Sequence, residues 1–314
     1  MNLTDYSYRF TEYPLTCDGI KLFLECTTEK QMKPERSILL IHGSTNSSHV
    51  FDINYEDYSI ARKLAREGFA VWRLDIAGYG RSGEVPNGFL PRMDYAAENI
   101  HTAIKLIQQE TGQNRIDLLG WSWGTVTTGR FAAKYPESVN HLVLLAPLLN
   151  GVGFREITEE FYQITWESMI EDFQRTDAGE IDPGIVDPAF VKLWCTCCRR
   201  YNKSHSPNAC RLDYYVNHSQ KLIDLDAISA PTLVICGDKD PYLDYKLVNA
   251  SIHHLPEGSA LEIIHGGSHI VMYEKPFYRD FQNRLISFLN RKETRRGIVL
   301  IKPDIFRVAF FIKT

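Results

Sequence analysis

The segment LLGWSWGTV, residues 118–126, places Ser122 between two tryptophans and flanks this trio with Gly120 and Gly124. It follows an apolar run and precedes a helical pattern, so it matches G-x-S-x-G in a strand–turn–helix context. In such a turn the serine is held in a strained backbone conformation with its hydroxyl above the sheet, and a side chain at either glycine would collide with neighbouring backbone. The pattern predicts that Ser122 is a nucleophile.

A serine nucleophile needs a base within hydrogen-bond reach, and that base must be oriented by a carboxylate. Among the ten histidines, His269 lies in the glycine-containing loop HGGSHIVM after a strand-like apolar run. Its rival His265 still belongs to that run, where the alternating direction of side chains leaves it less free. We therefore expect His269 to be the base.

The orienting carboxylate should come from the end of another strand, and TLVICGDKDPYL offers Asp238 and Asp240. Asp240 lies further into the loop and can reach an imidazole, whereas Asp238 is better placed to bond backbone groups in the turn. Asp240 is thus the expected acid. Asp75, in RLDIAGYGRSG, also ends a strand-like run but precedes Ser122, and we expect it to tie down the glycine-rich loop that follows.

Acyl transfer also needs donors for the negative charge that develops on the substrate oxygen. Backbone N–H groups serve best because they are fixed before the reaction. One candidate is the N–H of Trp123 at the start of the helix, and the other is that of Ser44, which follows SILLIHG. We expect the side chain of His42 to shape this loop rather than to take part in the chemistry.

The elements that must position these residues follow an alternating order. From Ser37 to about Arg291, short apolar runs without polar alternation alternate with helical patterns, including helices near 245–254 and 277–291. This order predicts an α/β fold, with a mostly parallel sheet covered by helices on both faces. Before it, two strand-like runs meet at Asp18-Gly19, a turn pair typical of an antiparallel hairpin.

The alternation stops between Leu148 and about Lys221, where FREITEEFYQITWESMIEDF, PAFVKLWCTCC and RLDYYVNH are rich in aromatic residues and have helical character. The segment should leave the sheet at the carboxyl ends of the strands, where ligands bind in open α/β sheets. It is therefore predicted to be a helical lid. Its aromatic residues could form either the core of the lid or an apolar acyl site. The candidates for the pocket are Trp121, Phe154, Phe161, Tyr162 and Trp166.

The two tryptophans beside Ser122 are expected to differ, one packing between helix and sheet and the other facing the pocket. The patterns divide the chain into a core at 1–147 and 222–293, a lid at 148–221 and a tail at 294–314. Pro303 interrupts the apolar runs of the tail. An extra strand pair, a homodimer contact and a disordered end all remain open for it.

The charge balance bears on the partner. Lys and Arg number 35 against 39 Asp and Glu, a net charge of −4, which argues against a nucleic-acid surface. The N-terminal sequence has no basic region followed by an apolar run, as a signal peptide would, and no apolar stretch is long enough to span a bilayer. We expect a cytoplasmic protein with reduced thiols that acts on a small molecule.

Four cysteines lie close together in the sequence, Cys195, Cys197, Cys198 and Cys210, with His205 between them. Structural zinc sites usually space their ligands as paired C-x₂₋₄-C units, and C-x-C-C followed by one distant cysteine does not match. Free thiols that are buried or half-buried fit the pattern equally well. We expect neither a metal nor another cofactor.

Taken together, these motifs resemble those of the α/β-hydrolase superfamily over residues 8–291. His42-Gly43-Ser44 is similar to its oxyanion motif, DIAGYGRS at 75–82 to its D-x-x-G-x-G-x-S loop, and GWSWG to its nucleophile elbow, and the order serine, aspartate, histidine agrees. The resemblance implies an eight-stranded, mostly parallel sheet, a lid inserted after strand six, and cofactor-free acyl transfer to serine.

The predicted function is a serine hydrolase that cleaves a carboxylic ester or related acyl bond, with an apolar or aromatic substrate. GWSWG is also similar to the elbow of proline iminopeptidases, but these carry H-G-G-P-G where this chain has HGST. A serine nucleophile disfavours the dehalogenases and epoxide hydrolases of the superfamily, which use aspartate. The remaining alternatives are an acyltransferase, thioesterase or cyclase acting on a carrier-bound chain, a non-hydrolytic lyase, and a binding protein on the same scaffold.

Overall fold

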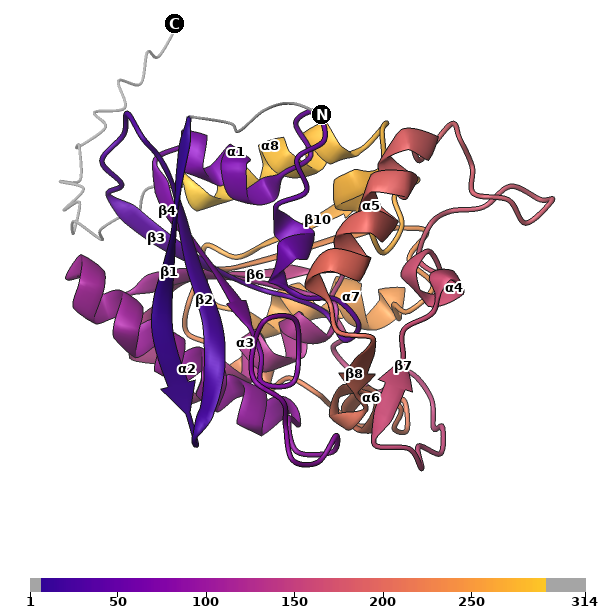
Figure 1. Cartoon of the computed structure of the whole chain (residues 1–314), viewed down its shortest axis with the longest axis horizontal. Coiled ribbons are helices and arrows are strands. Elements are labelled where there is room, and N and C mark those ends of the chain that lie inside the picture. The colour runs from indigo at the N-terminus through magenta and orange to yellow at the C-terminus, as the bar shows by residue number, and fades with distance from the viewer. Residues whose placement is uncertain (1–6, 292–314) are drawn as a thin grey trace, which may run out of the picture.

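An eight-stranded sheet forms the centre of the computed structural model, which describes residues 7–291 (Figure 1). The strand order is β1-β2-β4-β3-β5-β6-β9-β10. The pairs β1–β2 and β2–β4 are antiparallel, and the other five pairs are parallel. The predicted α/β fold with a mostly parallel sheet is confirmed. The predicted tail at 294–314 lies outside the described residues.

The central strands are apolar because helices cover both of their faces. Every residue of β4, β5 and β9 is buried, which is why these strands lack polar alternation. The strands are β1 (Tyr8–Cys17), β2 (Ile20–Glu29), β3 (Arg36–Ile41), β4 (Phe69–Asp75), β5 (Ile116–Trp121), β6 (Val139–Leu145), β9 (Thr232–Gly237) and β10 (Ala260–Ile264).

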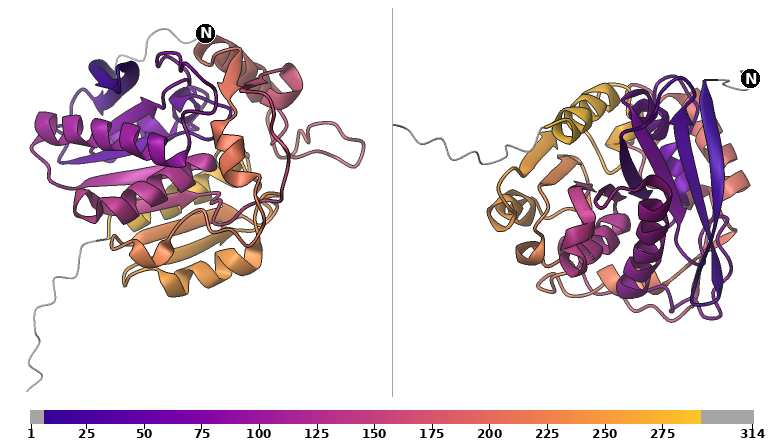
Figure 2. Two further views of the ribbon diagram at one scale, coloured as in Figure 1. Left: turned by 90° about the horizontal axis from the view of Figure 1, so that it is seen from below. Right: turned by 90° about the vertical axis from the view of Figure 1, so that its left-hand side faces the viewer.

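Two hydrophobic cores lie on opposite faces of the sheet. Residues of α2, α3 and α7 belong to one core, and residues of α1 and α8 belong to the other, as the two helical layers in Figures 1 and 2 show. The helices of these layers are α1 (Ile60–Arg66), α2 (Met93–Thr111), α3 (Trp123–Lys134), α7 (Tyr245–Ser251) and α8 (Tyr278–Leu289). Short 3₁₀ helices are η1 (Ser48–Phe51), η2 (Pro136–Ser138), η3 (Leu225–Ala227), η4 (Ile252–His254) and η5 (Val271–Tyr273).

The predicted hairpin at the start of the chain is confirmed. Asp18 and Gly19 have φ angles of 47° and 78°, and a two-residue type I′ turn requires positive φ at both positions. The turn joins Cys17 to its partner Ile20 at the first pair of the β1–β2 ladder.

The segment 148–221, called the insert below, lies between β6 and β9. It contains β7 (Phe161–Gln163), α4 (Trp166–Met169), α5 (Pro188–Tyr201), β8 (His205–Pro207) and α6 (Ala209–Tyr214). The helical character predicted for FREITEEFYQITWESMIEDF is wrong for most of that stretch. Phe161–Gln163 pairs with β8, and a helix begins only after Thr165, whose side chain caps it in a capping box.

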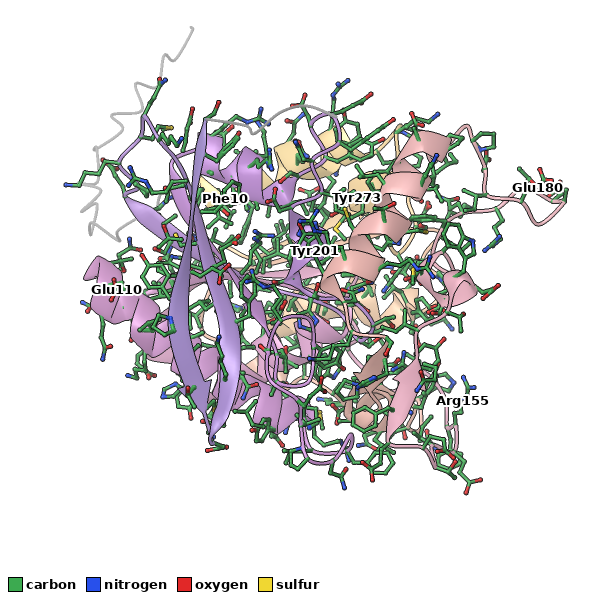
Figure 3. The ribbon with its side chains drawn as sticks, viewed as in Figure 1. Phe10, Glu110, Arg155, Glu180, Tyr201 and Tyr273 are labelled. Carbon is green, nitrogen blue, oxygen red and sulfur yellow. The ribbon has the colours of Figure 1, made fainter. Side chains whose placement is uncertain are left out.

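The insert is anchored to the rest of the molecule through α5. The Phe190 ring lies 5.0 Å from that of Tyr58 and 4.9 Å from that of Tyr273, between ring centroids. Tyr201, which Figure 3 labels, is the last residue of this helix. Its ring stacks on that of His49, with 3.7 Å between the ring centroids. These buried and stacked rings fix one side of the insert beside the sheet.

Across residues 7–291, no helix is both long enough and apolar enough to cross a membrane.

Candidate active site

Ser122 lies in the sharp turn between β5 and α3 and has φ 57° and ψ −124°. The flanking glycines are required by close backbone contacts. A Cβ atom on Gly120 would lie 2.2 Å from the carbonyl oxygen of Gly124, and one on Gly124 would lie 2.4 Å from that of Ile41. The turn therefore has the strained geometry expected of a nucleophile elbow.

Gly43 brings the loop after β3 against Ser122. A Cβ atom on Gly43 would lie 3.1 Å from the Cβ of Ser122 and 3.5 Å from its Oγ. Ser44 follows in the same loop and, with Ser122, lines one pocket. The backbone of Ser44 and the first turn of α3 are thus next to the Ser122 side chain, where oxyanion donors would be needed.

His269 is held by Asp240. Its Nδ1 lies 2.7 Å from Oδ2 of Asp240, and both side chains are buried. The other carboxylate oxygen of Asp240 accepts a hydrogen bond from the backbone N–H of Tyr242 at 3.0 Å. The indole of Trp121 donates to the carbonyl of His269 at 3.0 Å. His269 is therefore fixed from both its ring and its backbone, and it lines the same pocket as Ser122.

The charge around His269 is negative. Burial lowers the pKa of the imidazole, but the charge of Asp240 and its hydrogen bond, with further attraction from Asp172 and Glu171, outweigh burial and raise the pKa to about 9. Burial raises the pKa of Asp172, whose carboxylate accepts a hydrogen bond from the hydroxyl of Tyr242 at 3.1 Å. The ring of Tyr242 lies edge-on to that of His269 at 4.7 Å.

The rival residues form a second pair outside the pocket. Nδ1 of His265 lies 2.9 Å from Oδ2 of Asp238, and the His265 side chain is 87% exposed. Asp238 also accepts the backbone N–H of Gly266 at 2.7 Å, and its hydrogen bond to His265 lowers its pKa. Asp238 thus bonds the turn, as expected, and the pair does not line the pocket of Ser122.

His42 and Asp75 brace the neighbouring loops. Nε2 of His42 accepts the backbone N–H of Ile76 at 3.1 Å, so its Nδ1–H donates to the carbonyl of Gly43 at 2.8 Å. Burial lowers the pKa of His42, and the neutral ring fits this bonding. Asp75 accepts the backbone N–H groups of Ser48 and Arg81. Both residues hold backbone in place, as the sequence led us to expect.

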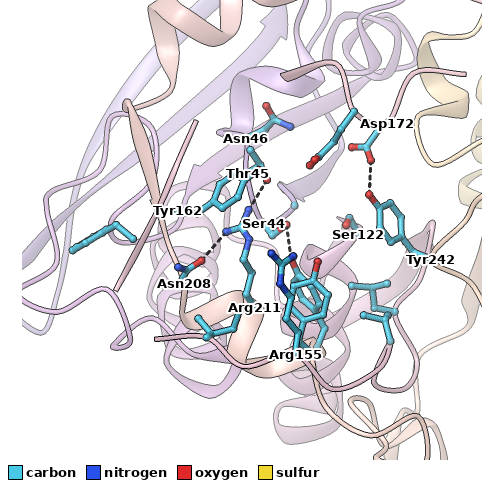
Figure 4. A pocket seen from close by; sticks show the side chains of 18 of the residues that line it. Ser44, Thr45, Asn46, Ser122, Arg155, Tyr162, Asp172, Asn208, Arg211 and Tyr242 are labelled. Carbon is cyan, nitrogen blue, oxygen red and sulfur yellow. Dashed lines mark hydrogen bonds between the residues drawn. The ribbon is translucent and has the colours of Figure 1, made fainter. Parts of the chain in front are cut away.

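The pocket above Ser122 has a volume of about 330 Å³ and is walled mainly by the insert (Figure 4). Its polar and charged walls were not predicted. They come from segments that no periodic pattern links in the sequence, and only the packing of the insert brings them together. The charged lining residues are Arg155, Glu156, Glu159, Glu171, Asp172 and Arg211, and the tyrosines are Tyr162, Tyr214, Tyr215 and Tyr242.

The two tryptophans of GWSWG have different surroundings. The Trp121 indole lines the pocket, with its ring centroid 5.6 Å from that of His269. The Trp123 side chain is fully buried in the core shared by α2 and α3, and its Nε1 donates to Oδ2 of Asp213 in the insert at 3.0 Å. One ring thus faces the pocket while the other packs inside, as the sequence led us to expect.

The structure separates the other predicted pocket residues into two groups. Phe161 and Tyr162 line the pocket together with Trp121. Phe154 and Trp166 do not line it, and their side chains are 81% and 50% exposed. The sequence predicted helical character for the stretch that contains both, but Phe154 lies in a segment without regular structure and Trp166 at the start of the short α4. No common helical face aims them at Ser122.

The clustered cysteines are dispersed. Cys195, Cys197 and Cys198 lie on α5, whereas Cys210 lies on α6 and its thiol donates to the carbonyl of Pro207 at 3.2 Å. All are free thiols. Between residues 7 and 291, no group of three or more histidine, cysteine, aspartate or glutamate side chains is arranged to hold a metal ion.

Comparison with known proteins supports this architecture. The family model described as serine aminopeptidase, S33 (Hydrolase_4) matches residues 32–276. The poly(3-hydroxyalkanoate) polymerase subunit PhaC of Haloferax mediterranei is 29% identical over 206 residues, which cover 62% of this chain and 40% of PhaC. The uncharacterized carboxylesterase nap of Bacillus subtilis is 24% identical, with 81% of this chain and 79% of nap covered.

A solved α/β hydrolase fold protein from Chitinophaga pinensis shares the fold at a TM-score of 0.64 and 14% identity, covering 90% of this chain and 98% of that one. The chain spans less than half the length of the two polymerase subunits and two acyltransferases that it matches. Because the family model covers most of the sequence, the chain belongs to the serine aminopeptidase S33 family of hydrolases, within the α/β-hydrolase superfamily.

Proposed function

We propose that the chain is a serine hydrolase that cleaves a carboxylic ester or a related acyl bond through an acyl-enzyme on Ser122. One observation carries the proposal. Ser122, at positive φ in its elbow, lines one pocket with His269, and the His269 ring is bonded at 2.7 Å to the buried carboxylate of Asp240. A nucleophile, a base and an orienting acid are the parts that acyl transfer to serine needs.

In the proposed mechanism His269 takes the proton of Ser122 as the serine oxygen attacks the carbonyl carbon. Asp240 stabilises the imidazolium, and the N–H groups of Ser44 and Trp123 hold the oxyanion. The imidazolium then gives its proton to the departing alcohol or other leaving group. Water, activated by the same histidine, attacks the acyl-serine and releases the acid.

The insert is proposed to act as a lid that selects the substrate, because its residues form most of the pocket wall. The division into a core at 1–147 and 222–293 and a lid at 148–221 is part of this proposal. The cytoplasmic location and the homodimer remain predictions from the sequence.

Stopped-flow hydrolysis of 4-nitrophenyl esters of increasing chain length tests the proposal. We expect a rapid release of 4-nitrophenolate equal to the enzyme concentration, because the acyl-enzyme forms before it is hydrolysed. We expect no such burst from Ser122→Ala. Turnover of the esters by Ser122→Ala at the wild-type rate would reject the proposal.

Acyl transfer to a second nucleophile is the other candidate, because relatives include PhaC polymerase subunits and the rat protein named 1-acylglycerol-3-phosphate O-acyltransferase ABHD5. Adding glycerol or another alcohol to the ester assay separates the two functions. A hydrolase gives mainly the free acid, whereas a transferase gives mainly the new ester.

A further inference from the structure

Arg211 is a buried cation without a carboxylate partner in the candidate active site. Its side chain lines the pocket of Ser122, and the residue is only 6% exposed. Within the part of the chain that the structure describes, the guanidinium forms no ion pair. It donates hydrogen bonds to neutral groups, those of Ser206, Asn208, Cys210 and Thr45. A buried charge without a counter-ion destabilises the folded protein, and binding of an anion would offset this cost.

The bonds of Arg211 hold the guanidinium in one orientation. Nη1 donates to Oδ1 of Asn208 at 3.3 Å, and Nη2 donates to Oγ1 of Thr45 at 3.1 Å (Figure 4). Nη1 also donates to Oγ of Ser206 at 3.2 Å. The ring of Tyr162 covers one face, with its centroid 3.8 Å from Cζ. Such bracing leaves the charge intact while it fixes the direction of the N–H groups, as in pre-organised anion sites.

The position of Arg211 relates it to the proposed chemistry. Thr45, which binds its Nη2, directly follows Ser44, the proposed oxyanion donor. Adjacent Cα atoms are about 3.8 Å apart. The guanidinium is therefore anchored to the residue next to Ser44, in the loop that would hold the reacting carbonyl. A second arginine of the insert, the exposed Arg155, lines the same pocket, with its Cζ 5.5 Å from the ring centroid of Tyr215.

The acidic residues of the pocket do not neutralise this cation. Glu156 and Glu159 are exposed, so water screens their charges. Burial and the charge of Asp172 raise the pKa of Glu171 and outweigh its attraction to Arg211, and the two side chains form no ion pair among residues 7–291. The Asp172 carboxylate is bonded to Tyr242 beside His269. The charge that these four carboxylates retain at the pocket would repel a dianion such as a phosphate monoester about twice as strongly as a singly charged group at the same place. A singly charged carboxylate therefore fits the buried guanidinium better.

We propose that the substrate carries a free carboxylate in addition to its scissile acyl bond, and that Arg211 binds this carboxylate. The inference rests on the proposed hydrolase function and names its substrate class. Arg211 is a specificity-determining residue in this account, because it contacts a part of the substrate that does not react. An alternative is that Arg211 only ties the insert to Thr45, and the experiment below separates the two.

Two matched pairs of esters provide the test. The first pair is mono-4-nitrophenyl adipate and its methyl ester, which differ in charge on the acyl side. The second is 4-carboxyphenyl butanoate and its methyl ester, which differ on the leaving-group side. We expect kcat/KM of the wild type to favour the anionic member of at least one pair by roughly tenfold or more, as hydrogen-bonded charge recognition allows.

Arg211→Gln should lower this preference by roughly tenfold or more, mainly through a higher KM for the anionic ester. Arg175→Gln is the matched control, because Arg175 is an exposed arginine of the insert that bonds only backbone carbonyls and should keep the wild-type preference. If Arg211→Gln does not fold, inhibition of the wild-type enzyme by an anionic and a neutral compound tests the proposal instead. Adipate should then inhibit hydrolysis of 4-nitrophenyl butanoate at a lower concentration than adipamide does.

The anion proposal is overturned if the wild type shows no preference in either pair, or if Arg211→Gln slows both members of the preferred pair equally, as a merely structural role would. In either case turnover of the neutral esters through Ser122 would leave the proposed function standing. If neither the neutral nor the anionic esters are hydrolysed and Ser122 forms no acyl-enzyme, the proposed function itself has failed.

Discussion

Trp123 and Asp213 join the turn at Ser122 to the insert. The indole Nε1 of Trp123 donates a hydrogen bond of 3.0 Å to Oδ2 of Asp213, and both side chains are fully buried. Asp213 also accepts hydrogen bonds from the Nε–H of Arg92 at 2.5 Å and from the backbone N–H of Met93 at 2.8 Å. The residue after Ser122 thus belongs to a buried network that connects α2, α3 and α6.

Replacing Trp123 by Phe should destabilise the protein, because it removes a donor from a buried carboxylate. We expect the free energy of unfolding to fall by about 2 kcal/mol, the cost of losing a hydrogen bond to a charged group. Urea denaturation followed by circular dichroism measures it. Trp166→Phe is the control. Because Trp166 is half-exposed, this substitution should lower the free energy of unfolding by less than about 0.5 kcal/mol. Equal stabilities of the two variants would contradict this role of the bond.

The raised pKa of His269 predicts an alkaline pH profile. A general base acts only when deprotonated, so kcat/KM should rise as pH increases and level off above the pKa of about 9. Asp172→Asn removes one of the charges that raise this pKa, so its rising limb should shift to lower pH, and Asp238→Asn should leave the limb in place. An ester assay from pH 6 to pH 10 measures all three profiles. A wild-type limb that is complete by pH 7 would contradict the prediction.

The two His–Asp pairs allow a matched comparison of carboxylates. Asp240→Asn should lower kcat by ~10⁴-fold with the fold intact, because an amide favours the wrong tautomer of the base. Asp238→Asn changes the same atoms in the exposed pair with His265 and should retain activity within a few-fold. Ester kinetics and circular dichroism of both variants check this. A larger loss from Asp238→Asn would exchange the roles of the two aspartates.

Gly124 tests the packing of the elbow. A Cβ atom there would lie 2.4 Å from the carbonyl oxygen of Ile41 and 2.6 Å from that of His42, so α3 and the end of β3 must move apart. We expect Gly124→Ala to cost about 1–3 kcal/mol in stability, as over-packing does, and to lower turnover. Gly184→Ala is the control, because its new methyl group would meet only the flexible carboxylate of Asp182. It should change the stability less than Gly124→Ala does. Thermal melts in which both variants match the wild type would show that the contact is not tight.

The strands, the turn at Ser122 and the choice of Asp240 could be predicted because each depends on a short stretch of sequence. The buried strand β5 reads as an apolar run because both of its faces are covered. The turn at Ser122 reads as an elbow because Gly120 and Gly124 each face backbone within 2.5 Å of an added Cβ atom. The preference for Asp240 over Asp238 follows from its place two residues further into the loop, where it meets His269.

The pocket wall could not be predicted, because it depends on how the insert packs. Arg211 and Asp172 lie in two stretches for which the sequence predicted helical character, and nothing local indicates that both line the pocket of Ser122. For Phe154, hydrophobicity alone was misleading, since the side chain is exposed on a segment without regular structure. The polar and charged residues of the pocket wall could therefore be identified only from the three-dimensional arrangement.

Labelling with a fluorophosphonate probe tests the central claim most directly, because the probe forms a stable bond only with an activated serine. After incubation at pH 8, intact mass and peptide mapping should show one adduct, located on Ser122, and none in Ser122→Ala at equal folding by circular dichroism. A wild-type protein without an adduct, or one labelled elsewhere and equally in Ser122→Ala, would contradict the assignment of Ser122 as the nucleophile.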